Sequence, residues 1–174
     1  MSLSMYQASI PVFISKLNSL TGVLKKAESF ALAKKIEPEI LINARLAPDM
    51  FALARQVQIA TDGVKGAAAR LAGVEIPSYP DTEKTFPELY ARIDKTIDFL
   101  KTFEPKQIDG SEDRKVTLKL RGQETSFLGQ AYLLNFVIPN FYFHTSMAYA
   151  ILRHNGVEIG KMDFLSDLME HVVK

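Results

Sequence analysis

A histidine within an uncharged stretch of sequence is the strongest candidate for chemistry. No charged side chain occurs between Phe127 and Leu152, and His144 lies inside this run. Asn140 stands four residues earlier, so on a helix the two side chains project from the same face. Buried polar groups need hydrogen-bond partners. The pair therefore indicates either a ligand or metal pocket at the centre of the protein, or a structural histidine bonded to a nearby carbonyl or hydroxyl group.

Pro139 favours the pocket interpretation. A proline inside a helix leaves the carbonyl four residues earlier, here that of Asn135, without its N–H donor, and it bends the helix axis. A bend beside two inward polar residues opens a space between helices, which is where bundles commonly hold ligands and metals. Aromatic residues surround the same segment. We expect most of them in the core or at an interface, with Tyr149 lining the pocket.

The other candidate groups fit surface roles. His154 follows Arg153 at the end of the run, where a cation suits the helix dipole, and His171 lies close to the C-terminus. The glycines within residues 156–161 lack the spacing of a phosphate-binding loop. The absence of cysteine excludes disulfides, thiolate nucleophiles and cysteine-type zinc sites.

The elements that must position His144 are helical. Apolar residues recur at alternating steps of three and four, which is typical of helices that bury one face. The expected helices span residues 4–35, 48–72, 85–103 and 126–155. In the first of them Pro11 should kink the opening turns, or Ser9 is a second start. Capping-box spacing predicts helix starts at Ser4 and Thr85, and Gly73 is placed to end the second helix.

Two smaller elements complete the expected fold. Alternation of polar and apolar residues from Arg114 to Leu120 predicts a strand, which pairs with a short second strand at 123–125. Asp163 is expected to cap a short C-terminal helix. That helix would carry Phe164, Leu165, Leu168 and Met169. The sequence thus predicts an all-α protein in one domain over residues 1–174: a four-helix bundle with a small β-hairpin between helices three and four and a short C-terminal helix.

Composition limits the partners and the location. Twenty-one basic and 20 acidic residues give a net charge of +1, so we expect no binding to nucleic acid or to an acidic membrane surface. The uncharged run is long enough to cross a bilayer, but its polar residues and Pro139 would be costly in lipid, and a buried central helix is the better interpretation. The first residues lack the pattern of a signal peptide, and we expect a cytoplasmic protein.

The sequence resembles a bacterial family of proteins with a domain of unknown function, over nearly its whole length. The resemblance is carried by the stretches PNFYFH at 139–144, AYAILRHNGV at 148–157, LAPDM at 46–50 and RQVQ at 55–58. That family is part of the DinB-like (YfiT-like) superfamily of proposed metalloenzymes. The resemblance implies a four-helix bundle, often a homodimer. Its active members bind a divalent metal through one histidine on the second helix and an H-x-x-x-H pair on the fourth, and some transfer low-molecular-weight thiols or act on small molecules.

The resemblance also implies where a metal site would be on the fourth helix. In the superfamily a Leu-Arg pair and then a glycine follow the second histidine of the H-x-x-x-H pair. Leu152, Arg153 and Gly156 follow His144 in this way, so His144 matches the second histidine. The position of the first histidine then falls on Asn140.

On the second helix, Gln56 is the best match to the superfamily histidine, with Gln58, Asp49 and Asp62 as alternatives. The implied metal set is therefore His144, Asn140 and Gln56. Amide side chains are weak ligands for zinc or nickel, which prefer imidazole. The chain thus departs from the superfamily pattern at two of three positions.

Two functions follow. The first is a small-molecule-binding or interaction module with a degenerate central metal site, assembled as a homodimer. The alternative is a divalent-metal-dependent enzyme of the transferase or hydrolase type that acts on a small molecule. In it, zinc or nickel anchored by His144 would activate a water or a thiol as a Lewis acid. Ligand chemistry favours the first function.

Overall fold

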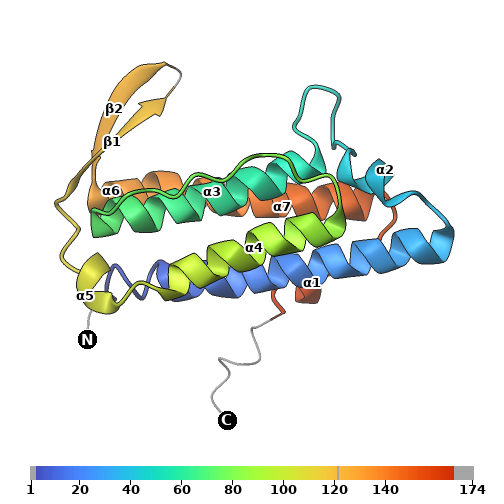
Figure 1. The fold of residues 1–174 in the computed structure, drawn as a ribbon, viewed down its shortest axis with the longest axis horizontal. Helices are drawn as coiled ribbons and strands as arrows, with labels where there is room; N and C mark the ends of the chain where they lie inside the picture. Colours follow the sequence, from blue (N-terminus) through green and yellow to red (C-terminus); the bar gives the residue numbers. More distant parts are fainter. Residues whose placement is uncertain (1–2, 121, 167–174) are drawn as a thin grey trace, which may run out of the picture.

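Four long helical segments lie side by side and carry the fold (Figure 1). The structure is a computed structural model that describes residues 3–120 and 122–166. Its first elements are α1 (Ile10–Lys34), α2 (Pro38–Ile42), α3 (Leu53–Ala72), α4 (Phe86–Lys101) and α5 (Pro105–Ile108). They are followed by β1 (Lys115–Leu120), β2 (Gln123–Leu128), α6 (Gly129–Tyr132), the π-helix η1 (Leu133–Val137), α7 (Ile138–His154) and α8 (Lys161–Phe164). The predicted bundle, hairpin and short C-terminal helix are confirmed.

A long return connection joins the second and third helices of the bundle. α3 and α4 run in the same direction, so residues 73–85 must lead the chain back along the bundle between them (Figure 1). Pro77 and Pro80 keep this linker from forming a helix. α3 packs against both α7 and α4, and α4 packs against α1. The linker and α7 are thus both neighbours of α3.

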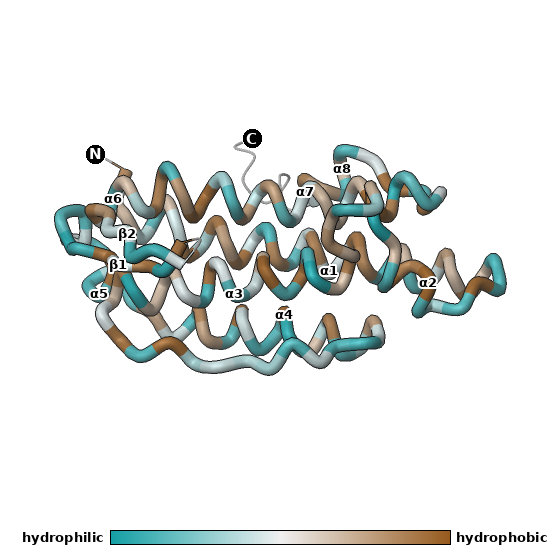
Figure 2. The backbone as a smooth tube through the Cα atoms, turned by 90° about the horizontal axis from the view of Figure 1, so that it is seen from above, coloured by the Kyte–Doolittle hydropathy of each residue, from teal (hydrophilic) through white to brown (hydrophobic). Residues whose placement is uncertain are grey.

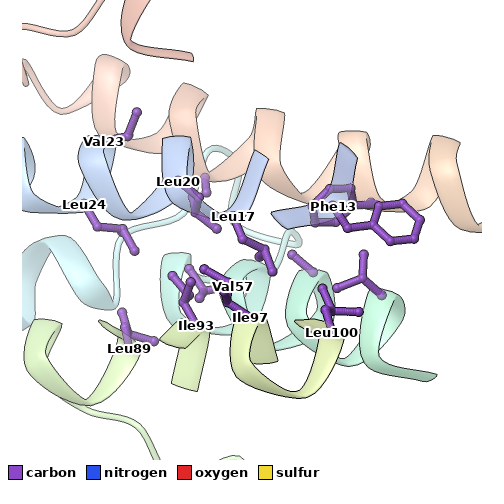
Figure 3. Close-up of a cluster of buried hydrophobic side chains, with 14 of the residues drawn as sticks. Phe13, Leu17, Leu20, Val23, Leu24, Val57, Leu89, Ile93, Ile97 and Leu100 are labelled. Carbon is purple, nitrogen blue, oxygen red and sulfur yellow. The ribbon is translucent and has the colours of Figure 1, made fainter. Parts of the chain in front are cut away.

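The core forms where the predicted apolar stripes meet. On α1 the stripe consists of Phe13, Leu17, Leu20, Leu24, Ala27 and Ala31, all of which are buried. Figure 3 shows the leucines of this stripe facing Leu89 and Ile93 of α4 and Val57 of α3. Hydrophobic and hydrophilic residues alternate along each helix in Figure 2. Amphipathic helices of this kind bury one face against each other and leave the other in water.

Local signals placed several helix ends correctly. Thr85 caps α4: its side chain accepts from the Glu88 N–H at 3.3 Å, and the Glu88 carboxylate accepts from the Thr85 N–H at 2.9 Å. Gly73 ends α3 in the left-handed conformation, with φ of 71°, which costs glycine nothing. Ser4 and Gln7 form their expected reciprocal bonds. α1 itself begins at Ile10 with Ser9 at its cap, which confirms Ser9 as the second start offered by the sequence.

The predicted start of the second helix was wrong. It was placed near Pro48, whereas α3 begins at Leu53. The preceding loop closes on itself, since the N–H of Leu53 donates to the carbonyl of Ala44 at 3.0 Å and that of Met50 donates to Ala47 at 3.0 Å. The turn at Met50 and the bond from Leu53 back to Ala44 hold the loop away from helical geometry. Helical hydrogen bonding therefore starts only at the end of this loop.

The hairpin is longer than the sequence predicted. The second strand was placed at 123–125, but β2 continues to Leu128, which pairs with Lys115. Cross-strand contacts extend it, including a 2.9 Å hydrogen bond between the hydroxyls of Thr117 and Ser126. Pairs of this kind stabilise a sheet beyond the propensity of its residues. The fourth helical segment therefore begins at Gly129 rather than at 126.

The proline in the fourth segment is accommodated by a π-helical turn. The N–H of Ile138 donates to the carbonyl of Leu133, five residues earlier, immediately before Pro139. Such a wide turn is a common way to absorb a proline or an extra residue within a helix. The segment is continuous across it, and α7 extends to His154.

The C-terminal helix starts differently from the prediction. Asp163 was expected at its cap, but Gly160 occupies that position, and the Asp163 carboxylate accepts from the Gly160 N–H at 2.8 Å. A carboxylate at the third helical position can bond back to the cap in this way. Leu168 and Met169 lie outside the described residues.

The uncharged run does not form a membrane-spanning helix. Within residues 3–120 and 122–166, no helix combines the length and the apolar character that crossing a bilayer would require.

Two glycines provide a matched test of this backbone. A Cβ at Gly129 would lie 1.9 Å from the carbonyl oxygen of Ser111, whereas one at the exposed helical Gly22 would meet nothing within 4 Å. We expect Gly129→Ala to lower the free energy of unfolding by more than about 2 kcal/mol through overpacking. Gly22→Ala should raise it by about 0.5–1 kcal/mol, because alanine is the better helix former. Urea denaturation measures both, and equal effects would contradict the packing at the start of α6.

Candidate functional site

The structure places the His144 side chain inside the bundle, between α7 and α3. The residue is 7% exposed. Its Nδ1 lies 2.7 Å from Oε1 of Gln56 on α3, within hydrogen-bonding distance. Among the described residues, Nε2 has no hydrogen-bond partner, and it is not one of the fully buried polar atoms that lack one. The second ring nitrogen therefore reaches water.

Gln56 is held from two sides. Its Nε2 donates to the carbonyl oxygen of Phe51 at 3.1 Å, in the loop before α3, and its Oε1 faces His144. The side chain is almost fully buried, at 1% exposed. Both polar atoms of the amide are thus engaged. This was the position matched most loosely from the sequence, and its contact with His144 is direct.

The three alternatives to Gln56 point elsewhere. Gln58 donates to the Glu83 carboxylate at 2.9 Å, and Asp62 pairs with Lys65 at 2.7 Å. Asp49 lies exposed in the loop before α3. Of the four side chains considered from the sequence, Gln56 is the one that contacts His144 in the described part of the chain.

Asn140 lies on the same side of α7 as His144, as the spacing predicts. It is half-buried, and its Nδ2 faces α3 at Gly63, 3.7 Å from where a Cβ on that glycine would stand. No hydrogen bond joins Asn140 to His144 among the described side chains. The amide therefore remains available to a third molecule.

Tyr149 belongs to a different face of α7. Its hydroxyl donates to the carbonyl of Ile159 at 3.3 Å, and its ring meets Phe164 of α8 edge to face at 5.9 Å. Together with α1 side chains it lines a small cavity that has no room for a water molecule. The structure thus brings His144, Gln56 and Asn140 to the α3–α7 interface and places Tyr149 towards α1 and α8.

The positive charge of Arg55 acts on the imidazole of His144. Burial first, and the positive charge of Arg55 second, lower the pKa of His144 below its ordinary value of 6.5. Arg55 pairs with Asp81 of the linker and donates to Oε1 of Gln58 at 3.3 Å. His144 is therefore neutral at physiological pH, with a guanidinium nearby.

The linker that carries Asp81 is anchored by a buried arginine on α4. The Arg92 side chain is 2% exposed. It donates to Thr61 at 2.8 Å, to the Pro80 carbonyl at 3.0 Å and to Glu83 at 2.9 Å, and it pairs with Asp81 at 3.0 Å. Charge-assisted bonds of this kind hold a segment firmly. Arg92 thus holds the acidic residues of the linker in place beside α3.

Sequence reasoning missed the residues around the imidazole. Phe143 meets the His144 ring edge to face at 5.2 Å and is 52% exposed. Phe51, whose carbonyl holds Gln56, is 55% exposed. Phe143 and Arg55 are chain neighbours of His144 and Gln56, and both lie in the stretches that carried the family resemblance. The roles of Arg92 and the linker gave no local signal, because their partners are distant in sequence.

The residues present do not fit a resident zinc or nickel ion. Both polar atoms of the Gln56 amide are hydrogen-bonded within the protein. One imidazole nitrogen and the Asn140 amide are then left as possible metal ligands. Zinc sites use three or four imidazole, thiolate or carboxylate ligands. No group of three His, Cys, Asp or Glu side chains suited to a metal occurs in the described part of the chain. The guanidinium of Arg55 would also repel a cation.

The comparisons with known proteins place this four-helix bundle among DinB-like proteins. The chain belongs to the family described as "Domain of unknown function (DUF1993)", whose model matches residues 5–165. It is also similar to the crystal structure of a DinB family member from Shewanella denitrificans, with 39% identity and a TM-score of 0.85. That match covers 92% of this chain and 90% of the other. No curated protein matches the sequence.

The lowered pKa of His144 predicts an acid-dependent loss of stability. The unfolded chain takes up a proton near pH 6.5, whereas the native imidazole resists it. The contribution to the free energy of unfolding is thus fully present above about pH 6.5 and falls as the pH drops towards the native pKa. His144→Gln should flatten this part of the stability profile, measured by urea denaturation between about pH 8 and pH 5. The exposed His154→Gln is the control, and an unchanged profile in His144→Gln would contradict the assignment.

Proposed function

We propose that this protein is a metal-free binding module in which His144, Asn140 and Gln56 line a site for a small molecule. The observation that carries the proposal is the accessible, unpartnered Nε2 of an otherwise buried imidazole. Because Nε2 reaches water, it can exchange that contact for a hydrogen bond to a ligand that displaces the water. The free amide of Asn140 offers a second polar contact on the same side of α7.

The proposal is tested by screening small neutral fragments by NMR through the His144 ring signals. Fragments that use the site should shift the His144 Cε1–H resonance and should not bind His144→Ala. His154→Ala, on the exposed end of α7, should bind the same fragments as the wild type. A screen in which no fragment discriminates His144→Ala from the wild type would refute the proposal.

Metal binding gives a separate prediction. The wild type should bind Zn²⁺, Ni²⁺ and Mn²⁺ only weakly, because it offers one imidazole and one amide. Asn140→His would create an H-x-x-x-H pair with His144, and we expect it to tighten Zn²⁺ binding at least about tenfold, as measured by calorimetry. The matched change Asn135→His, on an exposed position of η1, should not. Tight stoichiometric zinc in the wild type would contradict the prediction and favour a metalloenzyme.

We further propose that two copies associate through the uncharged outer side of the α6–η1–α7 segment. The exposed residues between 127 and 142 are Leu128 at the end of β2 and, along the helical segment, Gln130, Leu134, Asn135 and Pro139. Leu128 is 54% and Leu134 is 48% exposed. Depletion of charge with retained apolar area is the compositional mark of an interface core. The proposed partner is a second copy of this chain, since the same face on both copies forms a closed pair.

Light scattering tests the association. The wild type should have the molar mass of a dimer. Leu134→Glu should have that of a monomer, because it places a carboxylate in the apolar contact. Leu32→Glu, at a 68% exposed position of α1, should remain dimeric. A monomeric wild type, or equal behaviour of the two variants, would exclude this interface.

A further inference from the structure

The hydrogen bonds of Gln56 determine which nitrogen of His144 carries the proton. An amide presents a donor at nitrogen and an acceptor at oxygen. The nitrogen of Gln56 is oriented by the Phe51 carbonyl, which can only accept. The oxygen therefore faces His144 Nδ1, and this contact requires a proton on Nδ1. In a neutral imidazole, the lone pair is then on Nε2.

The atom that carries the lone pair is also the atom that reaches water. Nε2 has no partner among the described residues, so it presents a hydrogen-bond acceptor to a molecule that reaches it. Had the amide been reversed, the same ring atom would present an N–H donor instead. Whether Nε2 is an acceptor or a donor is therefore decided by the backbone carbonyl in the loop before α3 that orients the amide.

The surroundings narrow the chemistry of the molecule that Nε2 would accept. The Arg55 guanidinium disfavours ammonium and other cationic donors close to the imidazole. The half-exposed Phe143 ring, packed edge to face on His144, offers apolar surface to an aromatic ring. A neutral aromatic molecule with one hydroxyl donor satisfies both conditions.

We infer that Gln56 is a positioning residue that holds His144 in the Nδ1–H form, so that Nε2 accepts a hydrogen bond from the hydroxyl group of a phenol-like small molecule. This inference rests on the proposed function for its ligand. Its statement about the tautomer stands on the two hydrogen bonds of Gln56 alone, and the two parts are tested separately.

The tautomer is read from the imidazole ¹⁵N shifts of full-length protein at a pH where His144 is neutral. The wild type should show a protonated Nδ1 and an unprotonated Nε2. Gln56→Met, similar in size but without the acceptor, should lose this bias. Gln58→Met, two residues away and bonded to Glu83, is the control that should not alter the signals. A wild type protonated at Nε2 would overturn the inference whether or not any of the variants folds.

The ligand class is tested with phenol and anisole, which differ by the methyl group that removes the donor. Phenol should shift the His144 ring signals and bind at least about fivefold more tightly than anisole, the effect of one hydrogen bond. Gln56→Met should reduce this discrimination, whereas the control Gln58→Met should preserve it. Equal binding of phenol and anisole would overturn the assignment of Nε2 as the acceptor. If neither binds but other fragments engage His144, the ligand class is wrong while the proposed function stands.

Discussion

The contact between Gln56 and His144 is the interaction on which the site depends. It crosses from α3 to α7 through an apolar interior, where an unpaired polar group would be costly. Neither side chain could be buried alone. The Gln56 oxygen and the His144 Nδ1 are hydrogen-bond partners, and the Gln56 nitrogen donates to the Phe51 carbonyl. One ring nitrogen is left over, and its accessibility is what distinguishes this pair from a purely structural one.

The direction of the helices imposes a second constraint, which also affects the surroundings of His144. Because α3 and α4 are parallel, the linker between them must travel back along the bundle (Figure 1). A linker without helix or strand needs other anchors for its backbone and charges. Arg92 provides them from α4, and the anchored Asp81 then pairs with Arg55 beside the imidazole. The topology of the bundle therefore contributes to the charge near His144.

These two constraints together support the proposal that the site accepts an uncharged ligand rather than a metal. A metal ligand on the second helix would have to direct a lone pair into the centre of the site. Gln56 instead directs its oxygen at the ring of His144, and the charge of the Arg55 guanidinium opposes a further positive charge on the imidazole. The same helix positions are thus used for hydrogen bonding within the protein, which suits an uncharged ligand better than a metal.

The sequence by itself determined the helical elements and the residue at the centre of the site. The apolar stripes of α1, α3 and α4, the capping box at Thr85 and the stop at Gly73 depend on neighbours within a few residues, so local patterns reveal them. The predicted helix starts at 48 and 126 failed where distant groups compete for the backbone, as Ala44 does for Leu53 and Lys115 for Leu128. His144 and Asn140 could be paired by helical spacing, whereas Tyr149 could not be assigned to a face without knowing what packs on each side of α7. Only the tertiary structure decided that Gln56 meets His144 and that Arg92 anchors the linker, because these contacts join residues that the chain separates and the packing of the helices brings together.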